Sequence, residues 1–120
     1  MRWPLVVLLL AAVAVAGCGG PGAPDKDEQK RYVIHMTADS KFSPDEARIP
    51  VNSTVVWVND ANIPHDVQGH GEDESFSSGA FGALNQRGST YEFTFTKPGN
   101  YEYFCYVHHG SGMFGTLEVR

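Results

Sequence analysis

Cysteine is scarce in this chain, with only two among 120 residues. Two cysteines in an exported protein usually form a disulfide. Here Cys18 follows an apolar leader, whereas Cys105 lies in a segment with histidines and a methionine. Because one cysteine lies at the end of the leader and the other in a histidine- and methionine-containing segment, we expect the two to have separate roles. We therefore predict no disulfide between them. The fold must then be held together without a covalent cross-link between distant parts of the chain.

Basic side chains are also few, nine against fourteen acidic ones, for a formal net charge of −5. Removing a leader that contains Arg2 leaves eight basic residues and a net charge of −6. Nucleic-acid binding requires a basic surface, so this balance argues against a nucleic-acid partner. A mildly acidic surface suits either solubility or docking to a basic partner, and composition leaves both open.

Long apolar runs are absent except for Leu5–Ala16, which is too short to cross a bilayer and follows the positively charged start Met1-Arg2. We therefore predict a signal peptide over residues 1–17. The sequence Val15-Ala16-Gly17-Cys18 resembles the lipobox of bacterial-type lipoproteins. That resemblance implies that Cys18 is the lipidated first residue of the mature chain; the alternative is an ordinary signal peptide with a chance cysteine. The protein is expected at the outer face of the cytoplasmic membrane, or in the periplasm or cell envelope.

Residues 18–30 show no apolar periodicity and are rich in Gly, Pro and charged side chains. We interpret them as the lipidated cysteine and a flexible tether, whose roughly twelve residues would span on the order of 20 Å as a coil. Residues 31–120 then form a single domain.

No segment of that domain has a helical period with caps, so an all-β fold is predicted, with at most a helical turn or two in Gly69–Ser89. Short β-rich runs separated by turn residues are typical of a β-sandwich. Prolines at positions 44 and 50 keep the stretch between them out of a central strand. The clearest strands are Tyr32–Thr37, Ser53–Val58, Tyr91–Thr96, Tyr101–Cys105 and a last strand containing Leu117 and Val119.

Alternation predicts which side chains face the core. Tyr91, Phe93 and Phe95 share one face. In the next strand, Tyr101, Tyr103 and Cys105 point inward, with Glu102 and Phe104 outward. Leu117 and Val119 are in phase with Met113.

The segment Tyr101–Gly115 contains Cys105, His108 and Met113 in the spacing C-x-x-H-x-x-x-x-M. His65 follows Pro64 after a predicted strand, and it is the natural donor from elsewhere in the chain. Two imidazoles, a thiolate and a weak axial thioether are the donor set of a blue-copper electron-transfer site. Singly, each residue is more often solvated or part of a core than a ligand. Their combination in a small exported β domain predicts a metal site, with His109, His70 and His35 outside it.

Asn62–Val67 and Tyr101–Gly115 resemble the two copper-binding segments of the plastocyanin-type cupredoxins, including halocyanin-like lipoproteins, and the similarity runs from about Phe42 to Val119. It implies a Greek-key β-sandwich of seven to eight strands and one type 1 copper, Cu(II)/Cu(I), that carries one electron at a time. Partners would be redox proteins such as a cytochrome, an oxidase or a reductase, and the protein would be a monomer. Carried over residue by residue, the copper ligands are His65, Cys105, His108 and Met113. Tyr101 matches the family's tyrosine-corner position.

Three positions depart from the family pattern. Val107 stands where proline is common before the loop histidine, so the loop is less stiff. Asp66 replaces the common asparagine, whose side chain ties the two ligand loops together in the family; a carboxylate could still accept a backbone N–H. Phe104 stands where plant proteins carry an exposed tyrosine used in docking.

Other functions fit the sequence less well. A copper oxidase or nitrite reductase needs a further metal centre with an open position, and the paired His-x-His ligands of such oxidases are absent from the sequence. A copper carrier or storage protein is the alternative to an electron carrier. Zinc is a poorer fit than copper, because zinc rarely binds methionine.

The sequence leaves the role of two surface features open. Glu72, Asp73 and Glu74 form either a solvated loop face or a docking patch, and Phe114 is either exposed beside the site, with Ile63 and Pro64, or packed.

Overall fold

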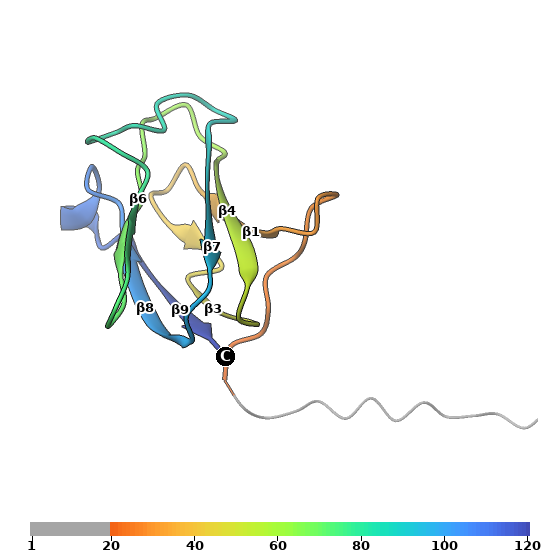
Figure 1. Cartoon of the computed structure of the whole chain (residues 1–120). Coiled ribbons are helices and arrows are strands. Elements are labelled where there is room, and N and C mark those ends of the chain that lie inside the picture. Colours follow the sequence, from red (N-terminus) through yellow and green to blue (C-terminus); the bar gives the residue numbers. More distant parts are fainter. Residues whose placement is uncertain (1–19) are drawn as a thin grey trace, which may run out of the picture.

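The computed structural model of the chain describes residues 20–120, which form two facing β-sheets (Figure 1). The first sheet has the order β2-β1-β4-β7 and the second β3-β9-β8-β5-β6. Nine strands are described, against seven to eight expected, because β2, β5 and β6 have only two or three residues, too few to show a period. The strands are β1 Tyr32–Met36, β2 Phe42–Ser43, β3 Glu46–Ile49, β4 Ser53–Asn59, β5 Gln68–His70, β6 Ser75–Ser77, β7 Thr90–Phe95, β8 Gly99–Phe104 and β9 Phe114–Val119.

The core lies between the sheets and is strongly aromatic. Trp57 of β4 is fully buried, and its ring stacks on those of Phe76 and Tyr91, with centroids 5.5 Å away in both cases. The predicted inner face of β7 is confirmed: Phe95 is fully buried, and Tyr91 and Phe93 pack against the core. Aromatic side chains bury a large area each, which gives a domain of this size a substantial core.

Strands β8 and β9 carry the predicted ligand segment. They pair antiparallel, with Gly99 opposite Val119 at one end and Phe104 opposite Phe114 at the other. The segment of residues 105–113 connects them at the second end, so it lies opposite the chain terminus. Alternation along β8 is confirmed, since Tyr101 and Tyr103 are buried and Glu102 is exposed.

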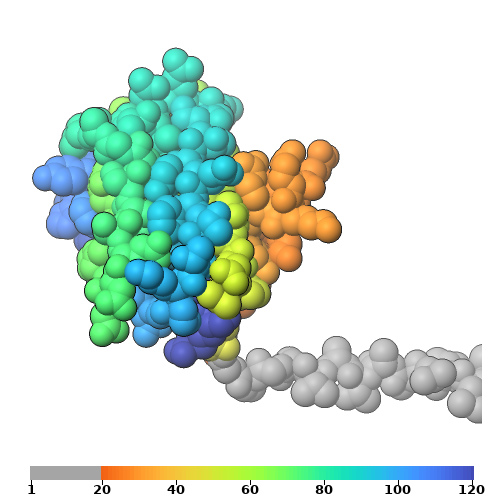
Figure 2. Space-filling view, in the orientation of Figure 1, coloured from red at the N-terminus to blue at the C-terminus, as the bar shows by residue number. Residues whose placement is uncertain are grey.

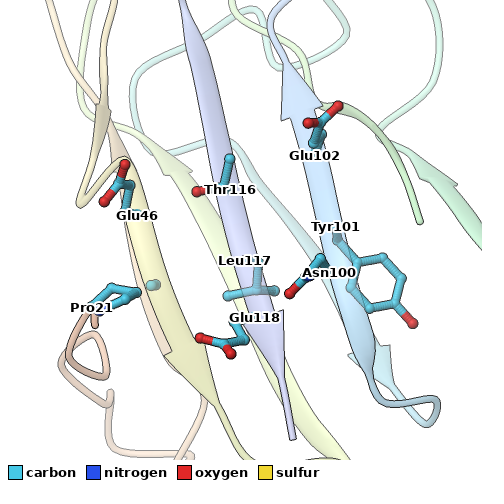
Figure 3. A pocket seen from close by; sticks show the side chains of 9 residues that line it. Pro21, Glu46, Asn100, Tyr101, Glu102, Thr116, Leu117 and Glu118 are labelled. Atoms are coloured by element: carbon cyan, nitrogen blue, oxygen red, sulfur yellow. The ribbon is translucent and has the colours of Figure 1, made fainter. Parts of the chain in front are cut away.

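The outer face of the five-stranded sheet is polar and acidic. Glu46, Thr116 and Glu102 stand opposite one another in one row across β3, β9 and β8 (Figure 3). Glu118, in β9, pairs with Arg48 and Arg120. Neither Glu46 nor Glu102 forms an ion pair with a Lys or Arg of the described residues, and Glu102 lies 3.8 Å from His70.

Packing of the domain begins upstream of residue 31, which the sequence did not indicate. The Gly22 carbonyl accepts a hydrogen bond from the Arg48 N–H at 3.2 Å, and the Asp25 carbonyl accepts one from the Val33 N–H at 2.8 Å. Pro24 is buried. Further along, residues 26–30 turn outward and stand out from the side of the domain (Figure 2). Part of the expected tether is thus held against β3 and β1.

The only helical turn in residues 20–120 is a 3-10 turn, η1, at His109–Ser111. It lies within the ligand segment and not in Gly69–Ser89, where the structure has the end of β5, strand β6 and turns. No helix in the described part of the chain is long and apolar enough to cross a membrane. The predicted signal peptide and Cys18 lie outside the described residues.

Candidate metal centre

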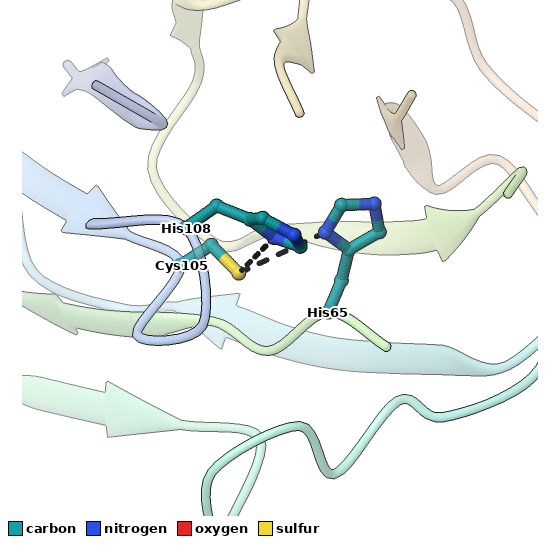
Figure 4. Close-up of side chains that lie close together, drawn as sticks. All are labelled: His65, Cys105 and His108. Carbon is teal, nitrogen blue, oxygen red and sulfur yellow. Dashed lines mark hydrogen bonds between the residues drawn. The ribbon is translucent and has the colours of Figure 1, made fainter. Parts of the chain in front are cut away.

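Three predicted ligands converge at the end of the sandwich where β8 ends (Figure 4). The Sγ atom of Cys105 lies 3.7 Å from Nδ1 of His65 and 3.6 Å from Nδ1 of His108. All three donor atoms lie within 4.8 Å of one another. The two imidazole rings are tilted by 58°, with centroids 4.9 Å apart. His65 and Cys105 are 40 positions apart in the sequence. The fold brings their donor atoms together with that of His108.

Backbone hydrogen bonds hold Cys105 and His108 in a tight loop. The Cys105 N–H donates to the Met113 carbonyl at 3.1 Å, and the His108 carbonyl accepts from the N–H groups of Ser111 and Met113 at 3.0 and 3.4 Å. Gly112, which ends η1, has φ of +78°, a conformation in which glycine is not strained. Glycine at this position therefore lets the loop close without backbone strain.

His65 is held in place through both its backbone and its imidazole ring. Its N–H and C=O form a bridge to Leu84, with N···O distances of 3.0 and 2.9 Å. Its Nε2 lies 3.0 Å from the Thr37 carbonyl, which can only accept, so Nε2 carries the proton. The lone pair of Nδ1 is then free to bind a metal, and it faces the Cys105 sulfur (Figure 4). The contact with the Thr37 carbonyl thus sets the imidazole tautomer that a metal ligand needs.

The triangle of donors has the size that a bound ion requires. For a three-coordinate ion with bonds of about 2.0 Å to nitrogen and about 2.3 Å to sulfur, separated by about 120°, each S···N distance would be about 3.7 Å. The observed distances are 3.7 and 3.6 Å. Both S···N distances therefore match those of a trigonal two-histidine, one-cysteine site, and two histidines with one cysteine are the donor set that favours copper.

Burial also sets the charge of the donors. Burial lowers the pKa of the His65 imidazole and raises the pKa of the Cys105 thiol, so in the absence of an ion both are neutral at pH 7. Metal binding must displace the thiol proton. The backbone N–H of Asp66 lies 3.4 Å from Sγ and is placed to stabilise the resulting thiolate.

Met113 is fully buried, and its backbone is hydrogen-bonded to Cys105 and His108. It therefore belongs to the same end of the fold as the three donors. The adjacent His109 is exposed and packs edge-on against Phe104 and Phe114, with centroids 5.1 Å away in both cases. It is not among the three clustered donors.

The remaining histidines form surface contacts. His35 lies 2.6 Å from a carboxylate oxygen of Asp60, and His70 lies 3.8 Å from one of Glu102. All four side chains are well exposed.

Phe114 is 50% exposed beside the site, which decides between the two alternatives left open by the sequence. Pro64 is also exposed and Ile63 is half-buried. Phe81 and Tyr106 are exposed too, and their rings contact edge to face at 5.7 Å. Sequence patterns did not indicate Phe81, because it lies in an irregular loop.

Asp66 accepts two backbone hydrogen bonds, one more than expected: from Tyr106 N–H at 2.7 Å and from Gly82 N–H at 2.8 Å. The expectation that this carboxylate ties the ligand loops is confirmed. Sequence reasoning missed the loop of Gly82, and it missed Asn59, whose side-chain amide donates to the carbonyls of Ile63 and Leu84 at 2.9 and 2.8 Å. An asparagine at the end of a Val-rich strand was the available signal.

The predicted tyrosine corner is present at the other end of β8. The Tyr101 hydroxyl donates its one proton to the Lys97 carbonyl at 2.7 Å, and a Glu74 carboxylate oxygen lies 3.3 Å from the same hydroxyl oxygen. Glu74 is thus partly engaged inside its own domain, whereas Glu72 and Asp73 are exposed.

Comparison with known proteins gives a consistent result. Residues 31–120 match the model of the family described as copper binding proteins, plastocyanin/azurin family. The chain is 39% identical to plastocyanin of Scenedesmus fuscus over 96 residues, covering 72% of this chain and 97% of that protein. It is 37% identical over 87 residues to the minor chloroplastic plastocyanin isoform of Arabidopsis thaliana, covering 66% of this chain and 50% of that protein, so it spans about half the length of that relative.

Two solved structures are similar to the whole sandwich. A purple cupredoxin from Nitrosopumilus maritimus has a TM-score of 0.59 and 27% identity, over 73% of this chain and 98% of that one. A copper-containing nitrite reductase from Thermus scotoductus has a TM-score of 0.64 and 27% identity, over 81% of this chain but 25% of the reductase.

Proposed function

The chain belongs to the plastocyanin/azurin family of copper-binding proteins, and on that premise we propose that His65, Cys105, His108 and Met113 hold the copper of an extracytoplasmic electron carrier. The protein is a blue-copper one-electron carrier with a cupredoxin-type Greek-key β-sandwich and one type 1 copper. The observation that carries this function is the triangle of His65, Cys105 and His108 donors at the distances given above.

The bound copper supplies the Cu(II)/Cu(I) couple, and the chain supplies a site that suits both states. Cys105 and His65 are fully buried in the sandwich and are held by backbone hydrogen bonds, so the donors stay in place when the charge changes. His108 is only partly buried, so we assign it as the port through which electrons enter and leave. Met113, buried beside them, is proposed as the weak axial ligand that helps to set the potential.

We further propose that residues 1–17 are a signal peptide and that Cys18 carries a lipid anchor. Pro21 lies near Ile49 and Arg120, at the end of the sandwich opposite the ligand segment (Figure 1). An anchor attached three residues upstream would hold that end toward the membrane. The copper end would then face away, toward a soluble or membrane-bound redox partner such as a cytochrome, oxidase or reductase.

An enzymatic function is not proposed. The similarity to the nitrite reductase covers 25% of that chain, so it shows a shared fold and carries no activity over. Residues 20–120 contain one cluster of three metal-ligating His, Cys, Asp or Glu side chains, whereas reductive catalysis needs a second centre open to substrate. Copper carriage or storage is the second candidate; it requires release of the ion, which a buried, preformed site opposes.

The test is the visible and electron-paramagnetic-resonance spectrum of the copper-loaded soluble domain, begun after Cys18. We expect an intense blue oxidised form that Cys105→Ser abolishes, because the thiolate is lost. Met113→Ala should keep the copper and shift the spectrum, and His109→Ala should leave it unchanged. Retention of the blue colour in Cys105→Ser would refute the site. Loss of copper during repeated oxidation and reduction would favour carriage instead.

A further inference from the structure

Asp66 is an acidic side chain in an unusual environment. Its exposure is 0%, and it is the only buried carboxylate among residues 20–120. Burying a charge is costly unless it is paired or well hydrogen-bonded. No Lys or Arg in the described part of the chain forms an ion pair with it. No basic side chain of the described residues is therefore placed to neutralise this carboxylate.

The hydrogen bonds of Asp66 explain how the carboxylate is tolerated. One oxygen accepts from Tyr106 N–H at 2.7 Å and the other from Gly82 N–H at 2.8 Å. Each oxygen thus receives a donor, the arrangement that suits an ionised, acceptor-only carboxylate. The two donors belong to different loops, so the side chain joins the Cys105 loop to the loop before Leu84.

Asp66 also lies next to the donors of the metal site. It follows His65 directly, and its own N–H reaches Cys105 Sγ at 3.4 Å. The carboxylate therefore belongs to the residue that follows one donor and whose N–H contacts the other, close enough for its charge to act on an ion held between them.

A fixed negative charge attracts a nearby doubly charged cation more strongly than a singly charged one. Water and salt screen a surface charge, but they do not reach a buried one to the same extent. We propose that Asp66 is a positioning residue with a second role: it clamps the two loops and, as a buried fixed charge, stabilises Cu(II) over Cu(I), lowering the reduction potential. This inference rests on the copper site proposed above.

The alternative is a purely structural clamp. Asparagine in place of Asp66 would keep one acceptor oxygen and lose the other together with the charge. Glutamate would keep the charge while displacing the oxygens from the Tyr106 and Gly82 N–H groups. The two substitutions thus separate charge from geometry, because both disturb the clamp but only one removes the charge.

The experiment is a redox titration of the copper-loaded full chain as wild type, Asp66→Asn and Asp66→Glu, with Glu72→Gln as control. At a fixed applied potential we expect the Cu(II)/Cu(I) ratio of Asp66→Asn to fall about tenfold, a midpoint rise of about 59 mV for a one-electron couple. Asp66→Glu should stay within about threefold of wild type even though its copper-free form unfolds more easily. Glu72→Gln removes the same charge at an exposed position and should change the ratio little.

An unchanged ratio in Asp66→Asn, or equal shifts in Asp66→Asn and Asp66→Glu, would overturn the proposal in favour of a clamp alone. If Asp66→Asn does not fold, Asp66→Ser is the second neutral variant, and failure of both to fold would equally assign a structural role only. A wild-type protein without a blue copper spectrum would instead refute the proposed function, so the two failures are distinguishable.

Discussion

Replacing Gly115 with alanine is expected to destabilise the domain through a single contact. Gly115 is buried in β9, directly opposite Tyr103 of β8, and a Cβ at position 115 would overlap the Tyr103 ring. That ring cannot simply move away, because it packs edge-on against Phe42 and Trp57 at 4.7 and 5.5 Å. Glycine is therefore required by close packing here, since its φ is not in the left-handed region.

The magnitude follows from two effects on the Tyr103 ring. Forcing an extra methyl group into a packed core costs about 1–3 kcal/mol, and disturbing the edge-to-face contacts adds about 1 kcal/mol. We expect the free energy of unfolding to fall by about 3 kcal/mol, which lowers the Tm of a domain this size by roughly 15 °C. Because Tyr103 and Gly115 lie two residues from Cys105 and Met113, the copper spectrum should broaden as well.

The assay is thermal unfolding of the copper-free domain, followed by circular dichroism. Gly110→Ala is the matched control, because a Cβ there meets no atom within 4 Å, and its Tm should stay within a few degrees of wild type. In a double-mutant cycle, Tyr103→Leu should relieve part of the cost of Gly115→Ala, giving clear non-additivity. A Gly115→Ala variant as stable as wild type, or additive effects in the cycle, would refute the reasoning.

Two further predictions concern stability. Tyr101→Phe removes the hydroxyl that donates to the Lys97 carbonyl at 2.7 Å and should cost about 1 kcal/mol in a urea titration with an unchanged copper spectrum; a shifted spectrum would contradict a purely structural role. For the copper-free protein, the pKa of buried His65 is lowered from 6.5 and that of buried Cys105 is raised from 9.0. Stability should therefore fall as the pH drops below about 6.5, where only the unfolded imidazole takes up a proton, and fall again above about 9, where only the unfolded thiol loses one. Urea titrations from pH 5 to 10 measure this, and the acid loss should diminish in His65→Gln; an equal loss there would exclude His65 as its cause.

Local sequence patterns predicted much of the structure that positions the site. The two-residue period of β7 and β8 determines which side chains face inward, because successive side chains of a strand must point to opposite faces. That rule placed Tyr101 and Tyr103 in the core. It also aimed Cys105 inward at the strand end. His108 and Met113 also stay close to Cys105 in the folded protein, since all three belong to one segment of nine residues.

Other features could not be predicted because no local pattern carries them. The attachment of residues 22–25 to the domain depends on backbone hydrogen bonds to Arg48 and Val33, which a Gly- and Pro-rich composition does not reveal. Strands β5 and β6 have three residues each; β5 forms by pairing with the edge of β8, and β6 forms by pairing with β5. The 3-10 turn at His109–Ser111 follows from closure of the ligand loop and not from helical propensity.

By itself the sequence determined the identity of the donors, their order along the chain and the face of the strand that carries the thiolate. These depend on residue type and on spacings of a few positions. Only the tertiary structure decided that His65 meets Cys105 at 3.7 Å, that the Thr37 carbonyl orients the imidazole, and that Asp66 is buried between two loops. Each of these contacts joins residues at least 16 positions apart in the chain. Their distances are set by how the two sheets pack, which no local rule encodes.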